Sequence, residues 1–79
     1  MNSDAIGQLI RQTRRALGLR QDELASVAGV SVRTLSEIEN GKESARIGLV
    51  LRVLDSLGID IRLEPSMTSV EPQSQQGAQ

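Results

Sequence analysis

Four side chains between positions 32 and 37 have the types and spacing of a surface that binds another molecule through hydrogen bonds. On a helical wheel they point away from Leu35 and Ile38, which can pack inward. The outward residues are Val32, Arg33, Ser36 and Glu37. This outer group is short, varied and rich in hydrogen-bonding ends. Such a surface contributes little to folding and is suited to recognition.

The chemistry of these four side chains matches the edges of DNA bases. An α-helix fits the major groove of B-DNA, where each base pair presents its own pattern of donors, acceptors and methyl groups. Arg33 can donate two hydrogen bonds to guanine, and Val32 can contact a thymine methyl group. Ser36 can bond to several bases, and Glu37 can accept from cytosine or repel unsuitable sites. The ordinary alternative for Glu37 is a solvated side chain paired with Arg33.

Two short helices with a tight break between them would position this surface. One helix is predicted over about 21–28, with Leu24, Ala25 and Ala28 inward, and Gly29 provides the left-handed turn that ends it. The next begins after Ser31, a good N-cap, and ends near 40–41.

A further helix is predicted before this pair, over about 4–17. Ser3 is its expected N-cap, and Gly18 ends it. Helical spacing predicts an inward face made of Ile6, Leu9, Ile10, Thr13, Ala16 and Leu17.

The last predicted helix starts near Ser44 and stops before Gly58. Its apolar residues cover roughly half of the circumference, which is wider than the stripe of about 100° that a core-facing helix needs. The excess predicts a contact with a second subunit through Leu49, Val53 and Leu57. Burial within the chain's own core is the alternative.

Residues 59–64, IDIRLE, alternate between apolar and charged side chains, as a strand does. A lone strand leaves its backbone groups unpaired, so we expect antiparallel pairing with the same strand of a second copy. Centring the pair on Ile61 avoids opposed like charges, because Asp60 then faces Arg62. The expected dimer interface comprises Leu49, Val53, Leu57, Ile59, Asp60, Ile61, Arg62 and Leu63.

The composition narrows the class of protein. The 79 residues suffice for one small domain, and none of them is cysteine, histidine or aromatic. Disulfides, cysteine–histidine zinc sites and histidine-activated nucleophiles are therefore impossible within this sequence. The acidic residues fall on exposed or capping positions, and no glycine loop suited to phosphate groups is present. We expect neither an enzyme nor a metal or cofactor site.

The charge distribution hints at a polyanionic partner. The formal net charge is −1, but seven of the nine Lys and Arg residues precede position 47, and acids predominate after it. An ordinary mixed surface is the alternative. No apolar run approaches the roughly 20 residues that span a bilayer, and the first residues lack a signal-peptide core. We expect a soluble cytoplasmic protein without a membrane partner.

The stretch QDELASVAGVSVRTLSEIENGK, residues 21–42, resembles the helix-turn-helix of the Cro/λ-repressor (XRE) family. Matching residues, in order and spacing, are Gln21, Leu24, Ala25, Gly29, Val30, Ser31, Leu35, Ser36, Glu39, Asn40 and Gly41. The resemblance extends from about 6 to 57. It implies an all-α fold, namely a small helix-turn-helix bundle of four to five helices. The C-terminal strand predicted above would pair across a homodimer.

The resemblance also implies roles for individual residues. Val32, Arg33, Ser36 and Glu37 match base-facing positions, and Arg14 and Glu39 match an internal ion pair. The expected phosphate-binding residues are Arg20, Gln21, Ser31, Thr34, Asn40, Lys42 and Arg46. Arg20 departs from the family, which usually has a capping Ser, Thr or Asn there, so a helix N-cap worth about 1 kcal/mol is lost. We expect Arg20 to bind phosphate instead.

Three regions follow from these patterns: a helix-turn-helix DNA-binding domain at 1–58, a dimerisation strand at 59–64 and a disordered polar tail at 65–79. The dimer would set its two recognition helices about 34–36 Å apart, so double-stranded DNA with an inverted repeat is the expected target.

The whole layout, and RIGLVLRVLDSLGIDIRLE in particular, is similar to HipB-type antitoxins of type II toxin–antitoxin modules. That resemblance implies a repressor of its own operon that also binds a HipA-like kinase toxin. A stand-alone repressor, from a phage or a restriction–modification controller, is one alternative. An adaptor that contacts only proteins is another.

Overall fold

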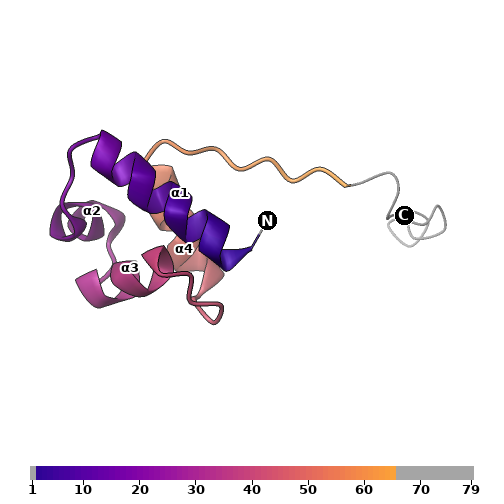
Figure 1. Ribbon diagram of the computed structural model, residues 1–79, viewed down its shortest axis with the longest axis horizontal. Coiled ribbons are helices and arrows are strands. Elements are labelled where there is room, and N and C mark those ends of the chain that lie inside the picture. The colour runs from indigo at the N-terminus through magenta and orange to yellow at the C-terminus, as the bar shows by residue number, and fades with distance from the viewer. Residues whose placement is uncertain (1, 66–79) are drawn as a thin grey trace.

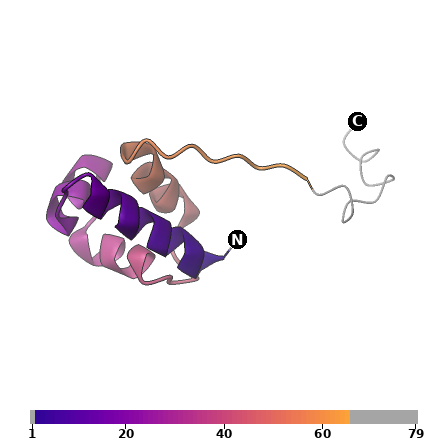
Figure 2. The same cartoon turned by 45° about the horizontal axis from the view of Figure 1, so that its top comes forward.

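Four helices form where apolar residues recur at helical spacing, and they enclose one aliphatic core. The computed structural model describes residues 2–65, and Figure 1 shows the helices followed by an extended segment. α1 spans Ser3–Ala16, α2 spans Gln21–Ala28, α3 spans Val32–Glu39 and α4 spans Ile47–Ser56. Figures 1 and 2 both show α1 lying alongside α3. The expected all-α helix-turn-helix bundle is confirmed.

The ends of the helices follow local hydrogen bonding, with two corrections to the prediction. The N-cap of α1 is Asn2 and not Ser3, because the Asn2 side chain accepts a 2.8 Å hydrogen bond from the Ala5 amide. α4 begins at Ile47 and not near Ser44, because residues 42–45 form a turn closed by the Ala45 amide and the Lys42 carbonyl. Ser31 caps α3 as predicted, through a 3.0 Å bond to the Thr34 amide.

The turn between α2 and α3 needs a glycine. Gly29 adopts a φ of 74°, in the left-handed region that side chains with a Cβ atom rarely occupy. Its amide and that of Val30 bond back to the carbonyls of Ser26 and Ala25, which closes the end of α2. α3 therefore leaves α2 at a sharp angle and presents a separate outer face.

The core consists of aliphatic side chains from all four helices. The predicted inward residues of α2 and α3 are buried. The buried apolar set is Ile10, Leu24, Ala25, Ala28, Leu35, Ile38, Val53, Leu54 and Leu57. Within residues 2–65, every buried side-chain nitrogen or oxygen atom has a hydrogen-bond partner. Polar groups in this core are thus satisfied as folding requires.

The buried face of α1 differs from the predicted one. Leu9 and Leu17 are 46% and 58% exposed, and Ala16 is also exposed, whereas Gly7 is buried together with Ile10. Arg14 is buried too, in agreement with the internal ion pair expected for it. A Cβ atom at Gly7 would lie 2.5 Å from the Ile38 carbonyl oxygen. The absent side chain at Gly7 therefore lets α1 approach the backbone of α3 closely.

The predicted apolar faces of α4 also need correction. Val53 and Leu57 are 0% and 8% exposed and belong to the core of the single chain, so their assignment to a dimer interface is wrong. Leu49 is half-buried. The exposed apolar side chains on this helix are Ile47, at 75%, and Leu51, at 45%. The core of the single chain therefore buries the side of α4 that the sequence predicts to face a second subunit.

Residues 59–65 leave the bundle as an extended segment (Figures 1 and 2). The Ile59 amide bonds to the Leu54 carbonyl at 2.9 Å, and its side chain is half-buried. Ile61 and Leu63 are 40% and 84% exposed. No strand is assigned between residues 2 and 65, so the pairing strand stays a prediction. The part of the predicted tail that follows Pro65 lies outside the described residues.

The first part of this segment borders an apolar groove next to α1. The groove has a volume of about 310 Å³ and is lined by Ala5, Ile6, Leu9, Leu54, Ile59, Asp60, Ile61 and Arg62. None of the helices within residues 2–65 is long and apolar enough to cross a membrane.

Candidate nucleic-acid interface

The outer face of α3 carries the four residues predicted to read bases. Val32 is 45% exposed, the Arg33 side chain is 90% exposed and the Glu37 side chain is 36% exposed. Ser36 is half-buried. Leu35 and Ile38 point the other way into the core. The four side chains therefore share a surface that is open to a ligand.

Glu37 is held by two cations on this surface. Its Oε1 lies 3.2 Å from Lys42 Nζ, and its Oε2 lies 3.6 Å from Arg33 Nε. The first is a hydrogen-bonded ion pair, and the second is an i,i+4 pair along α3. Glu37 thus offsets the positive charge of both residues.

A hollow beside α3 brings together three of the predicted phosphate-binding residues. It has a volume of about 230 Å³ and is lined by Thr34, Glu37, Lys42, Ser44, Ala45, Arg46 and Leu49. Its lining contains two cations and two hydroxyl groups, which are the donors that phosphate oxygens accept from. Ser31 stands just before it at the start of α3, where its hydroxyl lies 2.9 Å from that of Thr34.

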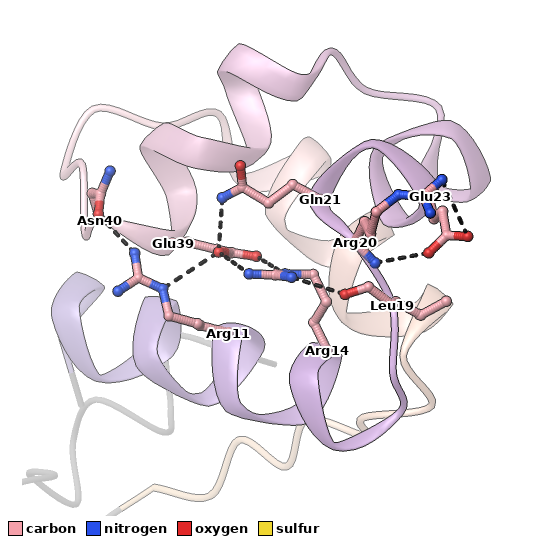
Figure 3. A network of polar contacts seen from close by, with 8 residues as sticks. All are labelled: Arg11, Arg14, Leu19, Arg20, Gln21, Glu23, Glu39 and Asn40. Carbon is pink, nitrogen blue, oxygen red and sulfur yellow. Dashed lines mark hydrogen bonds and ion pairs between the residues drawn. The ribbon is translucent and has the colours of Figure 1, made fainter.

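The opposite flank of α3 is built around the buried carboxylate of Glu39 (Figure 3). Arg14 Nε donates to Glu39 Oε2 at 2.7 Å, and Arg14 Nη2 donates to Oε1 at 3.1 Å. Arg14 Nη1 also donates to the Leu19 carbonyl at 2.9 Å. The ion pair that the resemblance implies is therefore present, and it joins α1 to α3 and to the loop before α2.

Two more side chains complete this network. Gln21 Nε2 donates to Glu39 Oε1 at 3.0 Å, and Arg11 Nε lies 3.5 Å from the same oxygen. Burial opposes ionisation of Glu39, but the hydrogen bonds from Arg14 and Gln21 and the charge of Arg14 outweigh it. The pKa of Glu39 is consequently lower than that of an ordinary glutamate.

The outer end of this flank carries Asn40. Arg11 Nη2 donates to Asn40 Oδ1 at 2.8 Å, so Asn40 connects through Arg11 to the Glu39 network. Asn40 is exposed and Gln21 is half-buried. The structure therefore brings Gln21 and Asn40, both predicted to bind phosphate, to the same side of α3.

The two flanks differ in position around α3. At 100° per residue, Thr34 and Glu37 border the hollow, whereas Ser36 and Glu39 border the Gln21–Asn40 side. The face that is predicted to read bases lies between them. A helix inserted into a groove needs this arrangement, because the two phosphate backbones line the two edges of the groove.

A helix-turn-helix family model matches residues 10–63, which is more than half of the chain. The chain belongs to the XRE-type helix-turn-helix family. It is 54% identical over 56 residues to the HTH-type transcriptional regulator y4mF of Sinorhizobium fredii, covering 71% of this chain and 74% of that relative. A transcriptional regulator of Methanothermobacter thermautotrophicus is 42% identical over 50 residues, which cover 63% and 72% of the two chains.

Solved structures show the same helix-turn-helix fold. A chain of the HipA–HipB–O2–O3 complex matches with a TM-score of 0.76 and 23% identity, covering 84% of this chain and 93% of that one. A structure described as MDT Protein matches with the same values. The family and its relatives identify this chain as a DNA-binding transcriptional regulator.

Arg20, one of the residues predicted to bind phosphate, forms ion pairs with two acidic residues of α2. Arg20 Nε lies 3.1 Å from Asp22 Oδ1, and Arg20 Nη2 lies 3.7 Å from Glu23 Oε2. The hydrogen bond from Arg20 lowers the pKa of Asp22. The Arg20 side chain makes no capping bond, as expected, and the Glu23 carboxylate accepts the Arg20 amide at 2.8 Å instead. These two acids therefore offset the charge of Arg20 at the start of α2.

The sequence does not predict the roles of two residues at this surface, Arg11 and Ser44. The sequence places Arg11 on the outer side of its helix, within reach of flanking DNA backbone, and does not predict its bonds to Glu39 and Asn40. The sequence predicts Ser44 near a helix start, but Ser44 lines the hollow instead. No local pattern could reveal either role, because Asn40 lies 29 residues from Arg11 and the turn at 42–45 depends on tertiary structure. No group of three acidic, His or Cys side chains in residues 2–65 could hold a metal ion.

Proposed function

We propose that this protein is a sequence-specific transcriptional repressor that reads the major groove with α3. The observation that carries the proposal is that Val32, Arg33, Ser36 and Glu37 lie on one outer face of α3, with Val32 and Arg33 exposed, between two flanks that carry hydrogen-bond donors. Arg33 is the main candidate for direct base readout, because its side chain is 90% exposed and can form a forked pair with guanine.

The phosphate contacts we propose fall into two sets. Lys42, Arg46, Thr34 and Ser31 serve the flank that contains the hollow. Asn40 serves the flank beside Glu39, and Gln21 and Arg20 can join it after leaving the carboxylates to which they are bonded. These contacts position the helix, whereas the α3 side chains discriminate among sequences.

We propose that two copies bind an inverted repeat as a homodimer. The exposed segment 59–64 pairs with its copy, and the apolar groove beside α1 receives Leu63 of the partner subunit. Two features support this: Leu63 is 84% exposed, and the groove is lined mostly by aliphatic side chains. Burying both would remove apolar surface that water otherwise contacts.

We further propose that the dimer is an antitoxin that represses its own operon and neutralises a HipA-like kinase toxin. The support is the layout of one helix-turn-helix followed by a short alternating segment, together with the likeness in fold to a chain of the HipA–HipB–O2–O3 complex. The proposal also places the protein in the cytoplasm, where its operator would lie.

A binding-site selection tests the repressor proposal. The wild-type protein is incubated with a pool of random duplexes, and the retained duplexes are sequenced. We expect an inverted repeat, with affinity that falls by about tenfold or more for Arg33→Ala, since a forked contact contributes about 1–3 kcal/mol of discrimination. Failure to enrich any duplex at low salt would favour a protein-binding adaptor.

A co-expression test addresses the antitoxin role. The reading frame next to the gene is expressed alone and with this protein. Growth arrest by a kinase-like neighbour, relieved when this protein is present, supports an antitoxin. A neighbour without kinase features, beside an intact operator, indicates a stand-alone repressor.

A further inference from the structure

Asn40 stands at the end of α3 with its carboxamide held from one side. Arg11 Nη2 donates to Asn40 Oδ1 at 2.8 Å, so the oxygen of the carboxamide is occupied within the protein. Figure 3 shows the Asn40 nitrogen pointing away from Arg11. The donor end of this side chain therefore faces outward.

The direction of a carboxamide matters at a phosphate. Its oxygen only accepts hydrogen bonds and its nitrogen only donates them, whereas phosphate oxygens only accept. An asparagine that rotates freely presents the wrong end for part of the time. A protein group that donates a hydrogen bond to the carboxamide oxygen fixes the orientation, so that the nitrogen faces the phosphate.

Arg11 is itself held by a buried carboxylate. Arg11 also contacts Glu39, whose side chain is fully buried and held by Arg14 at 2.7 Å. The same carboxylate turns Gln21 the opposite way, because Gln21 donates inward through Nε2 and its oxygen lies away from Glu39 in Figure 3. Asn40 is thus the carboxamide of this flank whose donor end is directed outward.

We infer that Arg11 is a positioning residue of the DNA interface: it holds the Asn40 carboxamide so that Nδ2 donates to a backbone phosphate. The inference rests on the proposed DNA-binding function. It assigns Arg11 an effect through Asn40 and not a phosphate contact of its own.

A double-mutant cycle tests this coupling on the duplex that the wild-type protein enriches from the random pool. The four proteins are the wild type, Arg11→Ala, Asn40→Ala and the double variant. We expect each single substitution to weaken binding about fivefold, the loss typical of one hydrogen bond. The double variant should bind within about twofold of Asn40→Ala, because Arg11 has nothing left to position.

The salt dependence separates positioning from direct contact. Loss of a cation that touches phosphate lowers the slope of log affinity against log salt by about 1. We expect Arg11→Ala to leave that slope unchanged. Arg15→Ala, an exposed arginine one turn further along α1, is the control for net charge and should change affinity less than about twofold. Additive losses in the double variant, or equal losses in Arg11→Ala and Arg15→Ala, would overturn the inference.

Asn40→Asp provides a second, independent variant. It keeps an oxygen for Arg11 and removes the donor, so folding stability should hold while DNA affinity falls by about tenfold or more. Wild-type affinity in Asn40→Asp would refute the role of Nδ2. If the wild-type protein enriches no duplex, the DNA-binding proposal itself fails, and the inference fails with it.

Discussion

Arg14 of α1 donates from Nε to Glu39 Oε2 of α3 across 2.7 Å, inside the bundle. The Arg14 side chain is 9% exposed and that of Glu39 is fully buried. Removing one partner would leave the other charge buried and only partly compensated, which typically costs about 3–5 kcal/mol. We predict a loss of this order in the free energy of unfolding for Arg14→Met, measured by urea denaturation. The double variant Arg14→Met with Glu39→Met should lose less than the sum of the two single variants.

The lowered pKa of Glu39 predicts acid sensitivity. Burial opposes its ionisation, but the hydrogen bonds from Arg14 and Gln21 keep its pKa below that of a glutamate in the unfolded chain. Its contribution to stability is therefore complete above the unfolded pKa and is lost as the pH falls through the folded pKa. We predict that acidification reduces the unfolding free energy of the wild type more than that of Glu39→Gln. Parallel pH profiles for the two proteins would contradict this.

Gly7 permits the close approach of α1 to α3. A Cβ atom there would meet the carbonyl oxygens of Ile38 and Glu39 at 2.5 and 2.6 Å, and both belong to the backbone. We predict that Gly7→Ala destabilises the protein by about 1–3 kcal/mol although alanine favours helices, because α3 must shift. Thermal unfolding followed by circular dichroism measures the effect.

Gly48 offers a matched control on α4. A Cβ atom at this position meets nothing within 4 Å. Gly48→Ala should therefore leave stability unchanged or raise it by about 0.5 kcal/mol. Equal responses at the two glycines would show that helix propensity, and not the contact with α3, decides the outcome at Gly7.

The sequence predicts the α2–α3 unit well. Leu24, Ala28, Leu35 and Ile38 are inward as their spacing requires, and Ser31 caps α3. Local signals sufficed because each short helix has one apolar side and a polar residue or glycine at its ends. The exposure of the predicted reading face follows from the same periodicity.

The faces of α1 and α4 were harder to predict for physical reasons. The buried residues of α1 include Gly7 and Arg14. A pattern of apolar side chains cannot predict their burial, because neither residue has an apolar side chain. α4 is apolar on several sides, so its spacing alone could not decide whether Val53 or Leu51 enters the core. The partners of Arg11 depend on tertiary contacts that no local pattern contains.

Glu37 pairs with two cations, Arg33 on the proposed base-reading face of α3 and Lys42 in the hollow beside it. It pairs with Lys42 at 3.2 Å and with Arg33 at 3.6 Å. We predict that Glu37→Gln raises affinity for a scrambled duplex about three- to tenfold and steepens its salt dependence, because both cations become free for phosphate. Discrimination between the selected and scrambled duplexes should fall, as fluorescence anisotropy with both can show.

Asp55→Asn is the control for this charge change. Asp55 is exposed on α4, so the variant alters the net charge equally without touching the Glu37 pairs. Its affinity for the scrambled duplex should stay within about twofold of the wild type. A response equal to that of Glu37→Gln would assign the effect to net charge alone.

The register of the proposed dimer strand can be decided by one charge reversal. Pairing centred on Ile61 sets Asp60 opposite Arg62 of the partner subunit, whereas pairing centred on Arg62 sets Asp60 opposite Glu64. Asp60 and Arg62 are both exposed in the single chain, so their substitution leaves the core intact. We predict that Asp60→Arg weakens dimerisation about three- to tenfold, and that adding Arg62→Asp restores it. Sedimentation equilibrium measures both constants, and tighter dimerisation of Asp60→Arg would instead establish the register centred on Arg62.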